Sequence, residues 1–429
     1  MKIHFVGIGG IGVSALAKYY IETGHKVSGS DLVSSEITDA LKKSGAKIII
    51  GKHKAQNLSK NAELVVYSPA VHKDNPELKT AKKLGIECQT YPQALGELTK
   101  NYFTIAVSGT HGKSTTTSMI GLLLVKAGLD PTVIVGTKLK EFNNSNCRVG
   151  KSKYLVIEAD EWQASFWNYW PQIIVLTNIE KEHMDFFRNM SHVFRVYLKY
   201  LNHLPADGVL VANKDDKNVF GLSKKIKNAK YYSIKQKESD SLRRILKIPG
   251  EHNVSNALAV LTIARILEIP DKTAIKALGE YKGSWRRFDE RKVKIGKYNI
   301  NVILDYGHHP TEIRLTLKAA REKYPKKRIW CVFQAHQYQR TYYLWDDFVK
   351  TFQNAPIDKL ILTDIYDVAG RENKRIKSKI NAKKLVEAIK KNQAIYLPKN
   401  KILVHLRKNL KRGDVVIVMG AGDLYKMFS

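Results

Sequence analysis

The sequence predicts an α/β protein in which parallel strands alternate with helices. Two glycine-rich turns each follow an apolar run and precede a stretch with helical periodicity. Polar clusters directly follow other apolar runs along the whole chain, as they do at the carboxyl ends of parallel strands. A length of 429 residues is too great for one ordinary core. We therefore expect several domains, with boundaries near residues 99 and 290.

The composition is that of a globular protein with an unusual excess of positive charge. Charged residues make up 26% and hydrophobic residues 44% of the chain, and the formal net charge is +32. Such an excess attracts anions, and nucleic acid is the first partner to consider. Lysine and arginine are nevertheless spread over the whole length, without an aromatic and basic binding motif. We expect small anionic substrates and no nucleic acid; a basic, nucleotide-dependent nucleic-acid-binding protein is the alternative.

Cysteine usage and hydropathy favour a cytoplasmic protein. The three cysteines lack C-x-x-C spacing, which indicates neither disulfides nor zinc. Lys2 and the apolar stretch ending at Ala17 resemble a signal peptide, but the glycines within this stretch argue against one. No window reaches the length of a membrane span, and we expect no membrane association.

The first glycine-rich turn predicts a nucleotide site. Gly7–Gly12 reads G-x-G-x-x-G between an expected strand, Lys2–Val6, and an expected helix, Val13–Glu22. A second strand ends at Asp31, and Ser68 follows a further apolar run. A pyrophosphate at the helix start is the functional interpretation, and NAD(P) is the usual ligand of such a turn. A purely structural turn is the alternative.

The second glycine-rich turn, Ser108–Thr116, predicts a phosphate-binding loop. The apolar run Tyr102–Val107 reads as a buried strand, and Ser118–Leu124 as an amphipathic helix. Glycines let the backbone approach an anion, and Lys113 brings charge to the β- and γ-phosphates. Val107 stands where the Walker pattern has its first glycine, so the motif is a shorter form. A glycine-rich turn with a chance lysine is the alternative.

Polar residues at two further strand ends predict a magnesium site in the middle third. Glu158 follows the apolar run Tyr154–Ile157, and together with the Ser114 hydroxyl it offers the hard oxygen ligands that Mg²⁺ prefers. His183 follows the run Gln172–Thr177 and is either a ligand of a second metal or a hydrogen-bonded structural residue.

Two interpretations stay open for Gly250–Asn256, which begins a helix. Its exposed amides could bind the edge of a base, or they could simply cap the helix.

The last third again alternates strands and helices, with motifs at the strand ends. We expect strands at 301–304, 328–333, 359–362, 394–397 and 415–419, and helices near 310–323, 342–353 and 381–391. Asp305–Glu312, Gln334–Thr341 and Gly420–Asp423 follow three of these strands. The polar, basic stretch Glu290–Asn299 is expected to connect this part to the rest. His308 and His309 are adjacent and point differently, so we place no metal there.

The ordered set of motifs resembles the Mur ligase family over essentially the whole chain. The motifs are G-I-G-G-I-G at 7–12, G-T-H-G-K-S at 109–114, E-A-D-E at 158–161, T-N-I-E at 177–180, H-M-D at 183–185, H-N-x-x-N at 252–256, R-R-F at 286–288, D-Y-G-H-H-P-T-E at 305–312 and M-G-A-G-D at 419–423. The resemblance implies a Rossmann-like domain for a UDP-sugar at 1–99, a central P-loop-type ATPase domain with a mostly parallel sheet at 100–290, and a Rossmann-like domain closing the site at 291–429.

The resemblance also implies a reaction. The carboxylate of UDP-N-acetylmuramate attacks ATP, with Mg²⁺ present, and the amine of L-alanine attacks the resulting acyl phosphate. The order Asp305-Tyr306-Gly307 favours this activity over the recycling ligase that adds a tripeptide to the same sugar nucleotide. A dehydrogenase would leave the phosphate loop unexplained. We expect a monomer or weak homodimer.

The resemblance assigns roles residue by residue. The implied catalytic residues are Lys113, His183, Asp305, His308, His309 and Arg340. Nucleotide binding is implied for Gly109, Thr110, His111, Gly112, Lys113, Ser114, Thr115, Asn178, Asn256 and Arg287. UDP-sugar binding is implied for Gly9, Gly10, Ile11, Gly12, Asp31, Ser68 and Tyr306. The implied metal ligands are Ser114, Glu158 and His183.

The chain departs from the family pattern at three places, which leaves the amino-acid acceptor open. Gln337 stands where the family has an arginine, Trp162-Gln163 where Ser-Asp is common, and Tyr91-Pro92-Gln93 replaces a basic stretch.

Overall fold

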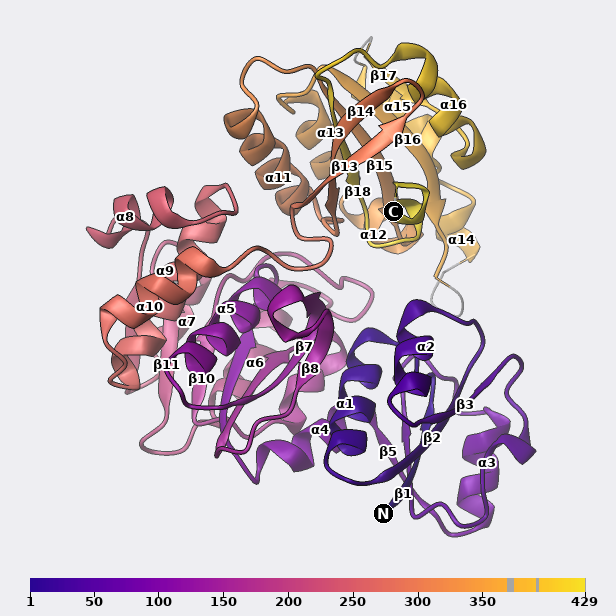
Figure 1. Cartoon of the computed structure of the whole chain (residues 1–429), viewed down its shortest axis with the longest axis vertical. Helices are drawn as coiled ribbons and strands as arrows, with labels where there is room; N and C mark the ends of the chain where they lie inside the picture. Colours follow the sequence, from indigo (N-terminus) through magenta and orange to yellow (C-terminus); the bar gives the residue numbers. More distant parts are fainter. Residues whose placement is uncertain (369–373, 391–392, 429) are drawn as a thin grey trace. The chain divides into compact units, whose positions relative to one another are not determined.

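The computed structural model describes residues 1–368, 374–390 and 393–428, which form three mostly parallel β-sheets flanked by helices (Figure 1). These residues fall into two compact units. Unit 1 comprises Met1–Glu180, Ser191–Ile245 and Ser255–Tyr281, and unit 2 comprises Lys181–Met190, Leu246–Val254 and Lys282–Ser429. The predicted α/β class is confirmed, and the domain boundaries near 99 and 290 stay a prediction. Among the described residues, no helix combines the length and apolar character needed to cross a membrane.

The first sheet of unit 1 contains five parallel strands in the order β3-β2-β1-β4-β5. The strands are β1 (Lys2–Val6), β2 (Lys26–Asp31), β3 (Lys47–Ile50), β4 (Leu64–Tyr67) and β5 (Glu87–Thr90), and the helices are α1 (Ile11–Glu22), α2 (Glu36–Lys43), α3 (Pro76–Lys83) and α4 (Tyr91–Thr99). The chain order reverses around β1, which pairs with both β2 and β4. Ligands of open α/β sheets bind at the carboxyl ends of strands at such a reversal.

The second sheet of unit 1 has the order β12-β11-β10-β6-β9-β7-β8. Its strands are β6 (Phe103–Ser108), β7 (Thr132–Leu139), β8 (Ser145–Arg148), β9 (Tyr154–Ala159), β10 (Ile173–Leu176), β11 (Val209–Asn213) and β12 (Ala229–Tyr232). The central strand β6 pairs in parallel with β9 and β10, and Ser108 lies opposite both Ala159 and Leu176. The polar segments that follow these three strands therefore begin at one edge of the sheet.

The helix after the phosphate loop differs from its prediction. It runs from Lys113 to Lys126 as α5, and Ser114–Leu124 are all buried. The expected amphipathic helix over 118–124 is therefore wrong, because α5 lies against β7 and β9 and also contacts α10 (Asp271–Glu280). The remaining helices of unit 1 are α6 (Met190–Leu201), α7 (Lys217–Ser223), α8 (Glu238–Ile245) and α9 (Glu251–Ile266), of which α9 begins in unit 2.

Unit 2 is built around a sheet of order β13-β14-β18-β15-β16-β17. Its strands are β13 (Asp289–Ile295), β14 (Tyr298–Asp305), β15 (Ile329–His336), β16 (Lys359–Tyr366), β17 (Ala394–Tyr396) and β18 (Val415–Met419). Its helices are α11 (Pro310–Lys323), α12 (Tyr338–Tyr343), α13 (Trp345–Gln353), α14 (Lys374–Lys377), α15 (Ala382–Ile389) and α16 (Lys399–Asn409). Side chains of α11, α13 and α15 pack in one hydrophobic cluster, and those of α16 pack in another that shares β14, β15, β16 and β18 with it.

Two predictions for the last third were wrong in detail. The polar stretch over 290–299 is not a simple connection, because Asp289–Ile295 forms an antiparallel edge strand whose side chains alternate in exposure. The helix expected over 342–353 is interrupted at Leu344, which separates α12 from α13. Lys391, the expected end of the helix from 381, lies outside the described residues.

Candidate active site

The phosphate loop connects β6 to α5 through two glycines in the left-handed region. Gly109 has a φ of +131° and Gly112 a φ of +82°. A methyl group on Gly109 would lie 2.1 Å from Oγ1 of Thr177, and one on Gly112 would lie 2.7 Å from Oδ1 of Asn256. Both conformation and space therefore require glycine here. The loop leads directly into the start of α5, where unsatisfied backbone N–H groups favour an anion.

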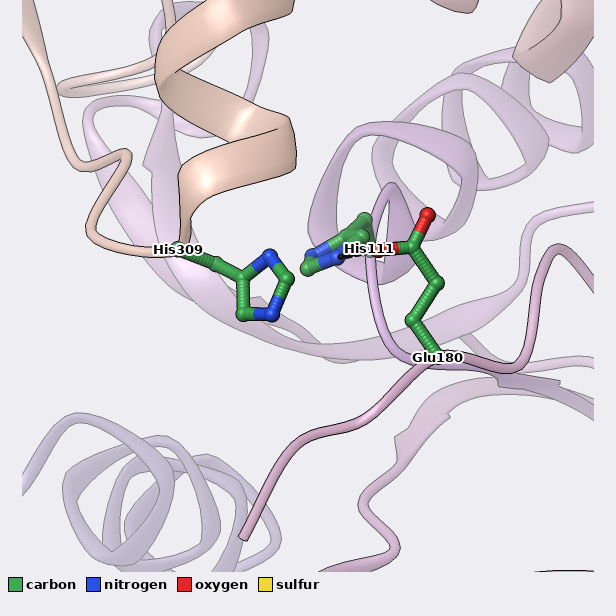
Figure 2. Close-up of side chains that lie close together, drawn as sticks. All are labelled: His111, Glu180 and His309. Carbon is green, nitrogen blue, oxygen red and sulfur yellow. Dashed lines mark ion pairs between the residues drawn. The ribbon is translucent and has the colours of Figure 1, made fainter. Parts of the chain in front are cut away.

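The segment after β10 fixes the phosphate loop in place. The backbone N–H of His111 donates to Oδ1 of Asn178 at 2.8 Å, and Nδ2 of Asn178 donates to the His111 carbonyl at 3.1 Å. The Thr177 hydroxyl donates to the same carbonyl at 2.7 Å. Nε2 of His111 lies 3.5 Å from Oε2 of Glu180 (Figure 2). Asn178, which we predicted to bind the nucleotide, thus shapes the phosphate loop itself.

Lys113 is held by a carboxylate that the sequence analysis did not assign to the site. Its Nζ donates to Oε2 of Glu161 at 2.8 Å and to the Gly109 carbonyl at 2.6 Å. Burial lowers the pKa of Lys113, but Glu161 and Asp160 outweigh burial, and the net shift is upward. Burial raises the pKa of the Glu161 carboxyl to about 8. A bound phosphate would compete with Glu161 for the Lys113 ammonium.

Glu158 and Ser114 place oxygen atoms together at the start of α5. The Ser114 hydroxyl donates to Oε2 of Glu158 at 3.1 Å, and the Gly136 N–H donates to Oε1 at 2.6 Å. Octahedral Mg²⁺ at its usual bond lengths separates neighbouring ligand oxygens by about 3 Å, so this pair fits two adjacent positions. His183, the third predicted ligand, belongs to unit 2.

The first glycine turn is also packed tightly, but by protein groups. The Gly9 N–H donates to Oδ2 of Asp31 at 2.8 Å. A methyl group on Gly9 would stand 2.9 Å from that oxygen, and one on Gly12 would stand 2.9 Å from Cζ of Tyr91. Asp31 therefore holds the turn itself, and Gly12 leaves room for the Tyr91 ring. Neither close approach was foreseen, because both depend on the tertiary fold.

Three further predicted residues, Gly10, Ile11 and Ser68, lie in or beside the first glycine turn. Gly10 is the N-cap of α1, and the Ile11 carbonyl accepts a bond of 2.6 Å from Nδ2 of Asn146. A methyl group on Gly7 would lie 3.2 Å from Cβ of Ser68, so the end of β4 borders the turn.

In unit 2, Asp305–His309 forms a polar turn at the end of β14. Asp305 is buried and accepts bonds from the N–H groups of Phe288, at 2.9 Å, and Gly307, at 2.7 Å. Burial raises the pKa of Asp305. Nδ1 of His308 lies 3.1 Å from the Tyr306 carbonyl, and burial lowers the pKa of His308 to about 3. Asp305 thus supports the turn, and His308 is neutral near pH 7.

The other predicted residues of unit 2 border the same turn or a nearby hollow. His309 caps α11 (Figure 2), and its Nε2 lies 3.1 Å from the Lys181 carbonyl. Arg340 is buried and donates from Nε to Oε1 of Glu182 at 2.9 Å. The guanidinium of Arg287 lies 4.8 Å from the centre of the Tyr306 ring.

A small open hollow lies within unit 2 and is lined by Lys181, Glu182, His183, Met184, Asp185, Gln337, Gln339, Arg340, Tyr343 and Leu344.

The structure brings the predicted residues together as two sets. In unit 1, the phosphate loop, Asn178, Glu158 and Asn256 gather around the start of α5. In unit 2, His183 and Arg340 line one hollow. Glu161 and Glu182 were missed as partners of the two key cations. The acidic run E-A-D-E was the available signal for Glu161.

Three family models match successive parts of the chain. Their descriptions are Mur ligase family, catalytic domain, for residues 2–103; Mur ligase middle domain, for 107–246; and Mur ligase, glutamate ligase domain, for 286–422.

Individual proteins are similar over nearly the full length. A UDP-N-acetylmuramate--L-alanine ligase of Acetivibrio thermocellus is 43% identical, covering 99% of this chain and 94% of the relative. One of Clostridium acetobutylicum is 41% identical, covering 99% and 96%. The crystal structure of the UDP-N-acetylmuramate-alanine ligase of Thermotoga maritima matches with a TM-score of 0.80 at 28% identity, covering 99% and 97%. A murein peptide ligase of Psychrobacter arcticus matches with a TM-score of 0.74, but at 22% identity it is evidence for the fold alone.

Proposed function

The chain belongs to the Mur ligase family, and from this premise we propose that it joins L-alanine to the carboxylate of UDP-N-acetylmuramate at the expense of ATP, in peptidoglycan precursor synthesis. The observation that carries the proposal is the similarity, at 41–43% identity over 99% of the chain, to relatives that bear this name. We also propose that the enzyme is cytoplasmic and is a monomer or a weak homodimer.

The reaction has two balanced steps. A carboxylate oxygen of UDP-N-acetylmuramate attacks the γ-phosphorus of ATP, an O–P bond forms, and ADP leaves. The amine of L-alanine then attacks the acyl carbon, inorganic phosphate leaves with the C–O bonding pair, and the amine loses a proton. Exclusion of water protects the acyl phosphate between the steps.

Lys113 and the start of α5 are proposed to bind the transferring phosphoryl group. Lys113 is a half-buried cation whose pKa is raised, and it would exchange Glu161 for phosphate oxygens. The backbone N–H groups after Gly112 would add hydrogen bonds. Fixed positive groups of this kind supply much of the rate enhancement in phosphoryl transfer.

Mg²⁺ is proposed to be held by Ser114 and Glu158, with His183 as a further ligand. The separation of 3.1 Å between the two oxygens of unit 1 supports this assignment. When bound, Mg²⁺ neutralises charge on the β- and γ-phosphates.

The remaining assignments follow the arrangement within each unit. Asn256 contacts the phosphate loop at Gly112 and would bind the adenine. The turn of Gly9, Gly10, Ile11 and Gly12, bordered by Asp31 and Ser68, would hold the UDP group at the start of α1. In unit 2, Arg340, Arg287 and the Asp305–His309 turn, including Tyr306, would complete the site around the acyl phosphate.

Phosphate release from Mg-ATP tests the proposed function. The assay contains UDP-N-acetylmuramate and, separately, L-alanine, glycine, L-serine or the recycled tripeptide. We expect the fastest release with L-alanine. Fastest release with the tripeptide would identify the recycling ligase instead, and retention on DNA without any ligand-stimulated release would favour the nucleic-acid-binding alternative.

Gly12→Ala is expected to weaken binding of the UDP-sugar. The new methyl group would meet the Tyr91 ring at 2.9 Å, which forces the ring or the start of α1 to move. We expect KM for UDP-N-acetylmuramate to rise about tenfold, with KM for ATP nearly unchanged. Gly221→Ala is the matched control, since Gly221 lies within α7 and a methyl group there would meet no atom within 4 Å. If KM for UDP-N-acetylmuramate were equal in both variants, the contact between Gly12 and Tyr91 would have no part in the substrate site.

A further inference from the structure

A buried carboxylate is bonded to the two strands that border the first glycine turn, and it has no role in the proposed reaction steps. Glu77, near the start of α3, has no exposed surface. Its Oε2 accepts bonds of 2.8 Å from Nε2 of His4 and from the Ser30 hydroxyl. Its Oε1 lies 2.8 Å from Nδ1 of His53 and 3.0 Å from Nδ2 of Asn57. We call these five residues the Glu77 network.

The charge of Glu77 determines the direction of every bond in this network. Burial raises the pKa of Glu77, but the bonds from His4, Ser30, Asn57 and His53 outweigh burial and bring it to about 2. An ionised carboxylate only accepts hydrogen bonds, so each partner must be a donor. His53 therefore carries a proton on Nδ1, and the Ser30 hydroxyl points at Glu77.

The Glu77 network connects directly to the backbone of the glycine turn. The Ser30 carbonyl accepts bonds from the N–H groups of Gly7, at 2.9 Å, and Ile8, at 3.1 Å. Ser30 thus joins the carboxylate through its side chain and the turn through its main chain. His4 lies in β1, three residues before Gly7. The strand that leads into the turn and the strand that carries Asp31 are both tied to one carboxylate.

We infer that Glu77 is a positioning residue for the nucleotide-sugar site: through Ser30 and His4 it sets the position of the glycine turn. This inference rests on the proposed function, because it assigns the turn to UDP-N-acetylmuramate. If Glu77 served the stability of the fold alone, Ser30 would not need to bond both the Glu77 carboxylate and the glycine turn. His4, Ser30 and Glu77 are buried, and their side chains bond to one another or to neighbouring protein groups, which is the condition under which such networks fix a single geometry.

The test compares Glu77→Gln with Glu63→Gln in the full-length chain. Glu63 directly precedes β4 in the same unit. Its carboxylate lies on the protein surface and accepts a hydrogen bond from the Lys2 N–H. In Glu77→Gln, an amide must face at least one donor, so the network has to rearrange. We expect Kd and KM for UDP-N-acetylmuramate to rise about 10- to 100-fold, while kcat and KM for ATP change less than about threefold. Glu63→Gln is expected to match the unaltered protein.

A spectroscopic readout separates positioning from loss of stability. In the unaltered protein above pH 8, the ¹⁵N shifts of His53 are expected to be those of a ring protonated on Nδ1. In Glu77→Gln, the amide nitrogen can donate to Nδ1, and the proton is expected to move to Nε2. If Glu77→Gln does not fold, Ser30→Ala removes one donor and keeps the carboxylate, with an expected rise in Kd of about 3- to 10-fold.

Several results would overturn the inference. One is a Kd for UDP-N-acetylmuramate that is unchanged in both Glu77→Gln and Ser30→Ala. Another is a parallel loss of sugar and ATP binding that follows the unfolded fraction, since this would mean a purely structural role. Failure of the unaltered chain to bind UDP-N-acetylmuramate would overturn the proposed function, and this inference with it. The unaltered chain therefore tests the proposed function, and the Glu77 and Ser30 variants test the inference.

Discussion

Replacing Lys113 with alanine is expected to lower kcat by at least about 10³-fold while leaving UDP-N-acetylmuramate binding nearly intact. The lysine lies in the phosphate loop after β6, whereas the first glycine turn follows β1 in a separate sheet of unit 1. Loss of the ammonium removes the charge that would meet the γ-phosphate. It also removes the cation that bonds Glu161, and the buried carboxyl, whose pKa is already raised to about 8, is expected to take up a proton.

The measurement pairs single-turnover phosphate release with calorimetric titration of the UDP-sugar. Lys126→Ala is the matched control, because Lys126 ends the same helix and pairs with Glu280 at the protein surface. The double variant Lys113→Ala with Glu161→Gln tests whether any loss of stability comes from the Glu161 carboxyl once the Lys113 ammonium is gone. Equal losses of phosphoryl transfer and UDP-sugar affinity in Lys113→Ala would show that the two anion sites are not separate.

The strand-turn-helix arrangement around both glycine turns was predictable, because it depends on residues that are close in sequence. The strand before the phosphate loop, the two glycines and the lysine at the helix start all stand within 103–114. The alignment of Glu158 with this loop followed from a general property of parallel sheets, whose carboxyl ends share one edge. The fold class was predictable because apolar runs followed by glycine-rich turns or polar clusters recur along the whole sequence.

The partners that hold these residues were not predictable, because they come from distant positions in the chain. Glu161 bonds Lys113 across 48 positions, and Glu77 bonds His4 across 73. Nothing in a single sequence says that Tyr91 occupies the space beside Gly12. The edge strand β13 was missed because its exposed face is rich in charge, which is typical of edge strands and also of connecting segments.

Replacing Glu158 with glutamine is expected to raise the Mg²⁺ concentration needed for half-maximal activity by about 10- to 100-fold. The change removes the negative charge but keeps an oxygen that can accept the Gly136 N–H, which bonds Oε1 at 2.6 Å in the unaltered protein. The loop should therefore keep its shape, and the Ser114 hydroxyl keeps a partner.

The Mg²⁺ dependence of phosphate release, measured at saturating ATP and UDP-sugar, separates the possible roles of Glu158. A metal ligand predicts that excess Mg²⁺ restores most of the activity of Glu158→Gln, because weaker binding is overcome by mass action. A group that only fixes the backbone at Gly136 predicts a lower kcat with an unchanged Mg²⁺ midpoint. Gly136→Ala is the companion variant, since its methyl group would stand 3.1 Å from Oε2 of Glu158 and would displace the carboxylate without removing its charge. If Glu158 binds Mg²⁺, both variants should raise the Mg²⁺ concentration needed for half-maximal activity. The shift should be larger in Glu158→Gln, because only that variant loses the charge that draws the cation to the phosphate loop.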